Sequence, residues 1–403
     1  MPYTTFPGND TILTTRDGNA LSAEGCELKG IVMSKGLEGI VAATTAISCI
    51  DGQNGRLFYR GIEINELASK SSFEETTALL WYGKLPTSHQ LESFVHKFQA
   101  NRQIPNEVLA LMMAMPKQTS AMEVLRTAVS ALSAYDPLEE DNSLEANVQK
   151  SIRLTASMPT IVAAWDRIRN GLWPVPPSNE LSHAANFLYM LTGTKPEDKA
   201  AEVLDTCLVL HGDHGLNAST FAARITASTL SDLHSAIVSA IGTLKGPLHG
   251  GANEQVMRML LEIGRPDHAD QWTRGALAAK RKIMGFGHRV YKADDPRAIW
   301  LQRLAQELAE ASGKTTWYEI SERVRKLVQE AKPLPVNVDF YSASVYYTLG
   351  IPIDLFTPIF AISRVSGWTA HVYEQYSDNR LIRPESEYVG PTDVDYTPIE
   401  ERK

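Results

Sequence analysis

Apolar residues recur at helical spacing along most of this 403-residue chain, and this periodicity limits the folds that the chain can adopt. Leu233, Ile237, Ile241 and Leu244 would share one face of a helix, and a second helix is expected to begin near Ala252. Helical patterns dominate almost to the end, after one short alternating segment. The sequence therefore predicts a mainly α-helical protein.

The short alternating segment is TTAISCIDGQNGRLFYRGIEI, residues 44–64, whose glycine-rich centre predicts a small β-hairpin. The pattern of residues 73–98 predicts two helices that are joined at 83–86. A further helix is expected from Pro296 to a closing Gly313, because proline is favoured at the first helical position and glycine just past the last.

The last two dozen residues, from Asn379 onward, contain several prolines and show no helical period. Such a segment does not build a core. We expect an extended tail that lies over a surface, either its own or that of a neighbouring subunit.

The formal net charge is -8, so the basic footprint of a protein that binds nucleic acid or an anionic membrane is missing. The three cysteines are widely separated, which predicts no disulfide framework and indicates a reducing compartment. No apolar run approaches the roughly 18 residues of a membrane span, and the first residues do not resemble a signal peptide. A cytoplasmic protein is therefore expected.

A histidine occupies an unusual place in GPLHGGANE, residues 246–254. His249 lies between a Gly-Pro pair and a Gly-Gly pair, just before the helix expected from Ala252. The positive end of that helix would keep the imidazole neutral, so that it can donate a hydrogen bond to a developing oxyanion. A capping or packing role for His249 is the alternative.

A second glycine-rich segment, MGFGHRVYKADDPRA, covers residues 284–298 and contains His288. Its glycines would let the backbone approach a ligand closely. Nearby cations suit carboxylates or phosphates, and a solvated basic loop is the alternative interpretation. The four cations are Lys282, Arg289, Lys292 and Arg297.

Asp339 precedes a predicted short helix that ends at residues 350–352. Aspartate is a preferred N-cap, a role that needs no function. The neighbours of this carboxylate are Val338, Phe340 and Tyr341, and in such apolar surroundings it could instead be a general base with a tuned pKa.

Two further stretches place polar residues in apolar surroundings. Arg364 lies in a largely apolar helical stretch, where a buried guanidinium needs an anion, either an internal carboxylate or a substrate. In LVLHGDHGLNAST, His211, His214 and Asn217 recur at every third position and could share one face. His211 continues an apolar stripe, which favours a structural role, and the segment lacks a third ligand at a recognisable metal spacing.

These motifs together resemble those of the citrate synthase family in its short prokaryotic form. LKGPLHGGANE, GFGHRVYKADDPRA, PVNVDFYSA and FAISRVSGW…IRPES match the family's site motifs in order and in spacing. The similarity runs from IVAATTAISC, residues 40–49, to the tail. Each motif alone is weak, but the set is specific.

The resemblance implies a transferase of the tricarboxylic acid cycle, which condenses acetyl-CoA with oxaloacetate and hydrolyses citryl-CoA to citrate and CoA. His249 matches the histidine that holds the thioester oxygen, and Asp339 matches the base that removes the methyl proton. His288 matches the acid that polarises the oxaloacetate ketone, and His214 matches a further oxaloacetate ligand.

The resemblance also assigns the cations of the site. Arg297 and Arg364 match arginines that clamp the substrate carboxylates. Arg383, in the tail, matches an arginine that reaches into the partner subunit's site. The expected CoA contacts are Arg289, Lys282 and Lys292.

The family fold is mainly α, with two domains and a small N-terminal hairpin. It implies a large domain formed by residues 1–249 and 345–403, and a small domain of residues 250–344 that closes over the site. The expected assembly is a homodimer or a higher oligomer. Acetyl-CoA is a co-substrate, and neither a metal nor a permanently bound cofactor is expected.

Two other functions stay open. A 2-methylcitrate synthase would share every catalytic residue but accept propionyl-CoA, a difference of one methylene that is worth only about 1–3 kcal/mol. Arg289 after His288 favours citrate synthase. The more distant alternative is a metal-dependent hydrolase built from His211, Asp213 and His214 together with His288.

The sequence departs from the family in two places. Gly215 stands where many relatives carry a glutamate, which leaves that flank of the pocket unassigned. Residues 1–35 match no part of the family that we can name, so their role stays open.

Overall fold

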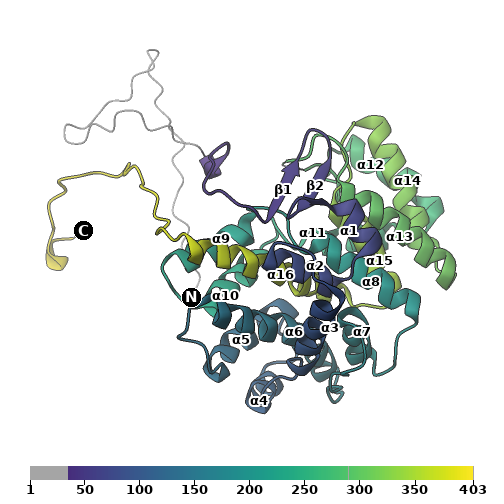
Figure 1. Cartoon of the computed structure of the whole chain (residues 1–403). Helices are drawn as coiled ribbons and strands as arrows, with labels where there is room; N and C mark the ends of the chain where they lie inside the picture. Colours follow the sequence, from purple (N-terminus) through teal and green to yellow (C-terminus); the bar gives the residue numbers. More distant parts are fainter. Residues whose placement is uncertain (1–34, 289, 403) are drawn as a thin grey trace. The chain divides into compact units, whose positions relative to one another are not determined.

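The computed structural model describes residues 35–288 and 290–402 (Figure 1). The chain divides into two units, Met1–Thr44 and Thr45–Lys403. In the first unit the described residues contain a 3-10 helix, Lys35–Leu37. The expectations about the start of the chain fall on residues 1–34, which lie outside the described part.

The second unit begins with a small antiparallel sheet, as the alternation of residues 44–64 predicted. Its strands are β1 (Ser48–Asp51), β2 (Arg56–Tyr59) and β3 (Ile62–Glu63), in the order β1-β2-β3. The turn between β1 and β2 packs closely against the residues that follow His288. A Cβ atom on Gly52 would lie 2.4 Å from the carbonyl oxygen of Val290, so this approach requires glycine.

The rest of the second unit is helical, which confirms the predicted class. The α-helices are α1 (Ile64–Lys70), α2 (Phe73–Tyr82), α3 (Ser88–Ala100), α4 (Asn106–Ala114), α5 (Ala121–Leu132), α6 (Leu144–Arg169), α7 (His183–Thr192), α8 (Asp198–His211), α9 (Ala218–Ser228), α10 (Leu233–Leu244), α11 (Ala252–Ile263), α12 (Pro266–Ala278), α13 (Pro296–Ser312), α14 (Thr316–Ala331), α15 (Val338–Thr348) and α16 (Phe356–Ser377). Short 3-10 helices lie at Ser133–Tyr135, Ile353–Leu355 and Ile399–Glu401. Within the described residues, no helix has both the length and the apolar character that crossing a membrane demands.

Several helix ends lie where their local signals predicted them. Helix α2 ends at Tyr82, and the following Gly83 has a left-handed φ of 76°. Helix α13 begins at Pro296 and is closed by Gly313 with φ 68°. Proline at the start and glycine just past the end satisfy the geometry that these positions require.

Helix α16 lies within a group of helices and packs against α2, α6, α8, α9 and α10. Almost all of its side chains are buried, Trp368 completely. A helix that is apolar on all sides is stable in such surroundings, where no face meets water. It therefore carries its one arginine, Arg364, into the interior.

Helices α11 to α15 form a second set of contacts, in which α13 packs on α15, α12 on α14 and α11 on α15. These helices lie within residues 250–344, which the resemblance assigns to a small domain. The domain boundary itself stays a prediction.

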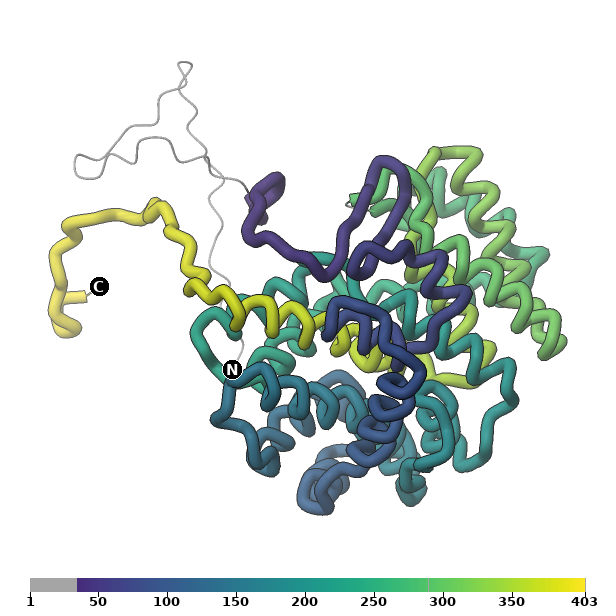
Figure 2. The backbone as a smooth tube through the Cα atoms, viewed as in Figure 1, coloured from purple at the N-terminus to yellow at the C-terminus, as the bar shows by residue number. Residues whose placement is uncertain are grey.

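After α16 the chain continues without regular structure from residue 378 to 398 (Figure 2). Its start is held by the end of α9, because the backbone N–H of Ile382 donates to Ser228 Oγ at 3.1 Å. The segment builds no core, as predicted, but the surface that it was expected to cover stays a prediction. Beyond Ile382 large apolar side chains are exposed. They are Tyr388, Val389, Val394, Tyr396 and Ile399.

Candidate active site

Two segments that lie about fifty residues apart in the chain pair with each other in the site. The backbone N–H of Gly287 donates to the carbonyl of Pro335 at 2.8 Å, and an isolated antiparallel bridge joins residues 286 and 336. His288 follows the first segment directly, and Asp339 comes shortly after the second. The pairing therefore fixes the two segments that carry these predicted catalytic residues relative to each other.

The start of α15 corrects one expectation about Asp339. The helix begins at Val338, so Asp339 lies in its first turn, and the N-cap is Asn337. Asn337 Oδ1 accepts from the Asp339 N–H at 3.1 Å, and its Nδ2 donates to the carbonyl of Gly287 at 3.1 Å. The capping explanation for Asp339 is wrong, so its carboxylate needs another one.

The carboxyl group of Asp339 has an unusual acidity. Burial raises its pKa to about 7, and Asp295 adds to the rise, although Arg297 and Arg364 oppose it. The described hydrogen bonds of Asp339 use its backbone atoms, not its carboxylate. A carboxylate whose pKa lies near the working pH is well suited to act as a general base.

His288 has a defined tautomer. Its Nδ1 accepts hydrogen bonds from the backbone N–H groups of Val290 and Tyr291, both at 3.0 Å. These bonds assign the proton of the neutral ring to Nε2. Burial, with a contribution from Arg297, lowers the pKa of His288 to about 4. At pH 7 the ring is therefore neutral and presents Nε2–H as a donor.

His214 lies beside His288, with ring centroids 5.3 Å apart at an interplanar angle of 76°. Its Nε2 is 3.3 Å from the hydroxyl oxygen of Tyr291. Burial lowers the pKa of His214 well below its ordinary value, and Arg297 and Arg364 lower it further. The structure thus brings together the two histidines that the resemblance assigned to oxaloacetate.

The expected common face of His211, His214 and Asn217 is wrong. Helix α8 ends at His211, the chain then turns, and Asn217 is the N-cap of α9. The structural role predicted for His211 agrees with its contacts, because the ring is fully buried and its Nδ1 lies 2.7 Å from the carbonyl oxygen of Cys207.

Asp213 is also committed to protein partners. Its carboxylate accepts from Ser48 Oγ and from the N–H of Gly215, the latter at 3.0 Å, and it lies 3.3 Å from His371 Nε2. Gly215 has a φ of 58°, in the left-handed region that favours glycine. With His211 and Asp213 directed to the protein itself, the metal-dependent hydrolase gains no support from this segment.

His249 contacts a helix, but not the expected one. Its Nε2 lies 2.8 Å from Ser219 Oγ and 3.3 Å from the Ser219 backbone nitrogen, which donates to it from the first turn of α9. The N-cap of α11 is Gly251, so the idea that His249 caps the following helix is wrong. The bond from Ser219 assigns the proton of the neutral ring to Nδ1.

The electrostatics of His249 agree with a neutral donor. Burial lowers its pKa to about 4, and Arg364 contributes to the decrease. Trp368 Nε1 donates to Ser219 Oγ at 3.1 Å. This bond holds the side chain of Ser219 in the position from which it contacts His249. At pH 7 the ring is therefore neutral and presents Nδ1–H.

Arg364 is a buried cation with an unused donor. Its side chain is 1% exposed, its Nε donates to the carbonyl of His211 at 2.7 Å, and its guanidinium lies 4.6 Å from the ring centre of Phe360. Among the described residues no carboxylate forms an ion pair with it, and Nη2 has no hydrogen-bond partner. Burial lowers its pKa to about 10. Since buried donors are normally paired, Nη2 marks a position for an anion.

Arg297 differs from Arg364, because it already has a carboxylate partner. Its Nε and Nη2 donate to the two oxygens of Asp295 at 3.0 and 2.8 Å, and both side chains are buried. Burial lowers the pKa of Arg297, but the adjacent Asp295 outweighs this effect and holds the pKa above its ordinary value.

Of the remaining predicted contacts, the described ones form no contact with this group. Lys282 and Lys292 are exposed, and the Lys292 backbone N–H donates to the carbonyl of Gly52 at 2.8 Å. Arg289 lies outside the described residues, and Arg383 is exposed in the tail. Their roles stay predictions.

Three residues of this arrangement were not predicted from the sequence: Ser219, Tyr291 and Asn337. Asn337 carried a usable signal, since asparagine directly before the first residue of a helix is a common N-cap. Ser219 is thirty positions from His249, and no local pattern connects them. Tyr291 resembled an ordinary core tyrosine.

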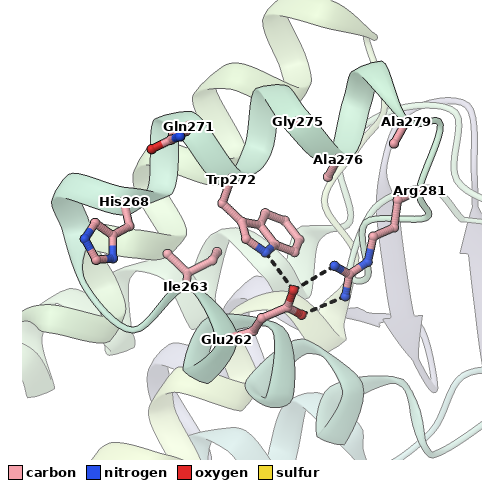
Figure 3. Close-up of a pocket in the computed structure, with 9 residues that line it drawn as sticks. All are labelled: Glu262, Ile263, His268, Gln271, Trp272, Gly275, Ala276, Ala279 and Arg281. Carbon is pink, nitrogen blue, oxygen red and sulfur yellow. Dashed lines mark hydrogen bonds and ion pairs between the residues drawn. The ribbon is translucent and has the colours of Figure 1, made fainter.

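A separate surface pocket of about 520 Å³ lies between the end of α11 and α12. Figure 3 shows Glu262 at its centre, between the indole N–H of Trp272 at 3.0 Å and the guanidinium of Arg281 at 2.7 Å. None of its lining residues is a predicted site residue, and the side chains of Glu262, Trp272 and Arg281 bind one another.

The helical fold combines three kinds of group. They are two neutral histidines with assigned N–H donors, a carboxyl group with a pKa near 7, and a buried arginine without an anionic partner. This combination is typical of an enzyme class that removes a proton next to a carbonyl group while it holds an anionic substrate.

Comparisons with known proteins identify the family. The family model for the C-terminal domain of citrate synthase matches residues 36–385. The citrate synthase of Haloferax volcanii is 51% identical over 375 residues, which cover 92% of this chain and 99% of the relative. The 2-methylcitrate synthase of Mycobacterium tuberculosis is 44% identical over 358 residues, 89% of this chain and 91% of the relative. The chain belongs to the citrate synthase family.

A solved structure agrees with this assignment. Citrate synthase from Thermoplasma acidophilum, solved as a ternary complex with carboxymethyl coenzyme A and oxaloacetate, is 34% identical. The match covers 92% of this chain and 100% of that chain, with a TM-score of 0.87. The predicted helical fold is therefore the fold of this family.

Proposed function

We propose that this chain condenses acetyl-CoA with oxaloacetate and hydrolyses the resulting citryl-CoA to citrate and CoA. Acetyl-CoA is then a co-substrate, and the enzyme needs no permanently bound cofactor. The observation that carries the proposal is the pairing of residues 285–287 with 335–337, which fixes the segment of neutral His288 against the segment of Asp339, a carboxyl group whose pKa is about 7.

In the first step Asp339 takes a methyl proton from acetyl-CoA. A thioester α-proton is too weakly acidic for a carboxylate unless the enolate oxygen is stabilised as its charge develops. We assign this stabilisation to His249, whose Nδ1–H is free to donate because Nε2 is held by Ser219. A neutral imidazole N–H can polarise a carbonyl group and stabilise the developing oxyanion by donating a hydrogen bond to it.

In the second step the enol or enolate carbon attacks the ketone carbon of oxaloacetate, and the carbonyl oxygen takes up charge. We assign His288 to that oxygen, since its Nε2–H is the available donor. Arg364 would hold one substrate carboxylate through its unpaired Nη2, with Arg297 and His214 as further contacts. Fixing both reactants replaces a bimolecular encounter with positioned groups.

Hydrolysis of the citryl thioester then consumes one water, breaks the carbon–sulfur bond and releases CoA as a thiol. We propose that CoA lies along residues 282–292, with Lys282, Arg289 and Lys292 near its phosphates. Closure of residues 250–344 over the site would exclude water until condensation is complete and so protect acetyl-CoA.

We further propose a cytoplasmic homodimer in which Arg383 completes the partner subunit's site. Two observations support the dimer. The tail around Arg383 carries exposed apolar side chains, and α9 holds its start through Ser228. An extended apolar segment is stabilised when it is buried on another surface.

The direct test is an assay of CoA thiol release by the purified protein with acetyl-CoA and oxaloacetate. The variant Asp339→Asn is expected to lose at least about a thousandfold in turnover, because an amide cannot accept the proton. Calorimetric binding of oxaloacetate should persist in this variant. Unchanged turnover would refute the assignment of the base.

Asp205→Asn provides a matched control. Asp205 is another carboxyl group whose pKa is raised by burial, but it accepts from the Phe73 N–H, outside the candidate site. Its substitution is expected to leave turnover within about twofold, so a loss specific to Asp339 reports chemistry rather than the removal of a buried carboxyl group.

A 2-methylcitrate synthase is the second candidate, because one of the relatives carries that name. The same assay separates the two, with propionyl-CoA in place of acetyl-CoA. A higher kcat/KM with propionyl-CoA than with acetyl-CoA would replace our proposal by this alternative.

A further inference from the structure

Tyr291 connects the two histidines that we assign to oxaloacetate. Its side chain is 1% exposed, and its ring centre lies 4.7 Å from that of His288 and 5.5 Å from that of His214. Its backbone N–H donates to His288 Nδ1 at 3.0 Å, and its hydroxyl lies 3.3 Å from His214 Nε2. One residue thus contacts both rings at the nitrogens that would face away from the substrate.

The direction of the bond between Tyr291 and His214 follows from what each group can do. A phenol hydroxyl is a good donor, and the described residues offer the Tyr291 hydroxyl no acceptor other than His214 Nε2. A neutral imidazole has one unprotonated nitrogen, which is a strong acceptor. The pair is therefore satisfied when the hydroxyl donates to Nε2, and this arrangement leaves the proton of His214 on Nδ1.

The contact also links two parts of the chain. Tyr291 belongs to the loop after His288, within residues 250–344, whereas His214 belongs to the segment between α8 and α9. Among the described residues, residues 283–292 and residues 211–217 are joined by one hydrogen bond, which is the bond between Tyr291 and His214.

We propose that Tyr291 is a positioning residue, whose hydroxyl fixes the tautomer of His214 and thereby the Nδ1–H donor that His214 presents to oxaloacetate. This inference rests on the proposed function. The hydroxyl acts through His214 and does not contact the reacting atoms. Its removal should weaken oxaloacetate binding and leave the chemistry of acetyl-CoA nearly unchanged.

Tyr291→Phe tests the proposal, because it removes the hydroxyl but keeps the ring that packs on both histidines. The KM for oxaloacetate is expected to rise about five- to tenfold, the usual effect of one lost hydrogen bond. The KM for acetyl-CoA and kcat should stay within about twofold. In ¹⁵N-histidine spectra, His214 should carry its proton on Nδ1 in the parent and become a mixture of tautomers in the variant.

Tyr373→Phe is the matched control, since it removes another buried tyrosine hydroxyl, which donates to the Asn147 carbonyl at 3.2 Å. It should shift neither KM nor the His214 resonances, which a His214→Gln variant identifies. If Tyr291→Phe leaves the oxaloacetate KM and the tautomer unchanged, or lowers thermal stability without the KM split, the proposal is overturned. A parent protein that releases no CoA would contradict the proposed function instead, and the tautomer would still be measurable.

Discussion

Arg297 and Arg364 are both buried arginines, but they differ in the charge that each has left for a ligand. Asp295 neutralises Arg297 through two hydrogen bonds, whereas Arg364 is held by a backbone carbonyl and keeps its full charge. A paired guanidinium can still orient a carboxylate through its remaining donor. We therefore expect Arg364 to supply most of the attraction for the substrate and Arg297 to supply orientation.

The acidity of Asp339 predicts how turnover depends on pH. Its pKa is raised to about 7 by burial, and a base must be ionised to accept a proton. The kcat/KM for acetyl-CoA is therefore expected to fall about tenfold for each pH unit below about pH 6, and to level off above about pH 8. A rate profile measured between these limits checks the prediction.

The two histidines make this profile simple to interpret. Burial holds the pKa values of His249 and His288 at about 4, so neither ring titrates between about pH 6 and pH 8. A profile that stays flat across this range would contradict the assignment of Asp339 as the base.

At the residue level, the sequence predicted which residues belong to the candidate site better than it predicted their contacts. The motifs around His249, His288 and Asp339 could be recognised because each is local. The partner of Arg364 could not be predicted, since the choice between an internal carboxylate and a substrate depends on the three-dimensional surroundings. The neutral state of His249 was expected for a wrong reason, because Ser219 of α9 contacts the ring instead of α11.

Among the elements, the loop before His288 depends on one glycine. Gly285 has a φ of 86°, and a Cβ atom there would lie 2.6 Å from Cδ2 of Phe340 in α15. Gly285→Ala is therefore expected to lower the free energy of unfolding by at least about 2 kcal/mol. Turnover should fall more than tenfold, because the displaced loop carries His288. Thermal unfolding and the CoA-release assay measure the two effects.

Gly275→Ala is the control for this substitution. Gly275 lies within α12, and the space around an added Cβ is open. Alanine is favoured over glycine inside a helix by about 0.5–1 kcal/mol, so this variant should be slightly more stable and equally active. If both variants behaved alike, the loop would not depend on the conformation of Gly285.

The helices were more predictable than the pairing that builds the site. Their ends are marked by nearby residues such as Pro296 and Gly313, and their faces follow from apolar spacing. The pairing of residues 285–287 with 335–337 joins distant segments through backbone bonds and leaves no alternating pattern. No local signal could reveal it.

For the whole molecule, the proposed dimer makes a prediction about mixed subunits. Arg383→Ala and Asp339→Asn should each be almost inactive alone. If Arg383 serves the partner's site, a mixed dimer contains one complete site, and a statistical mixture should recover about a quarter of the parent activity. Co-expression of the two variants followed by the CoA-release assay measures this recovery.

The mixed-dimer experiment also has a result that would contradict the prediction. If Arg383 serves the site of its own subunit, each site in a mixed dimer carries one defect, and no activity returns. Mixtures of parent and Asp339→Asn chains provide the reference for subunit exchange.

The proposed binding of a substrate carboxylate at Arg364 Nη2 would couple the concentration of that substrate to the stability of the protein. Without a bound dicarboxylate, the folded chain keeps a buried guanidinium donor that has no hydrogen-bond partner. A ligand that binds the folded form alone adds stability in proportion to the logarithm of its concentration, about 2.7 kcal/mol at one hundred times its Kd. The enzyme should therefore be most resistant to heat and proteolysis when its substrate is abundant, and be degraded fastest when that substrate runs low.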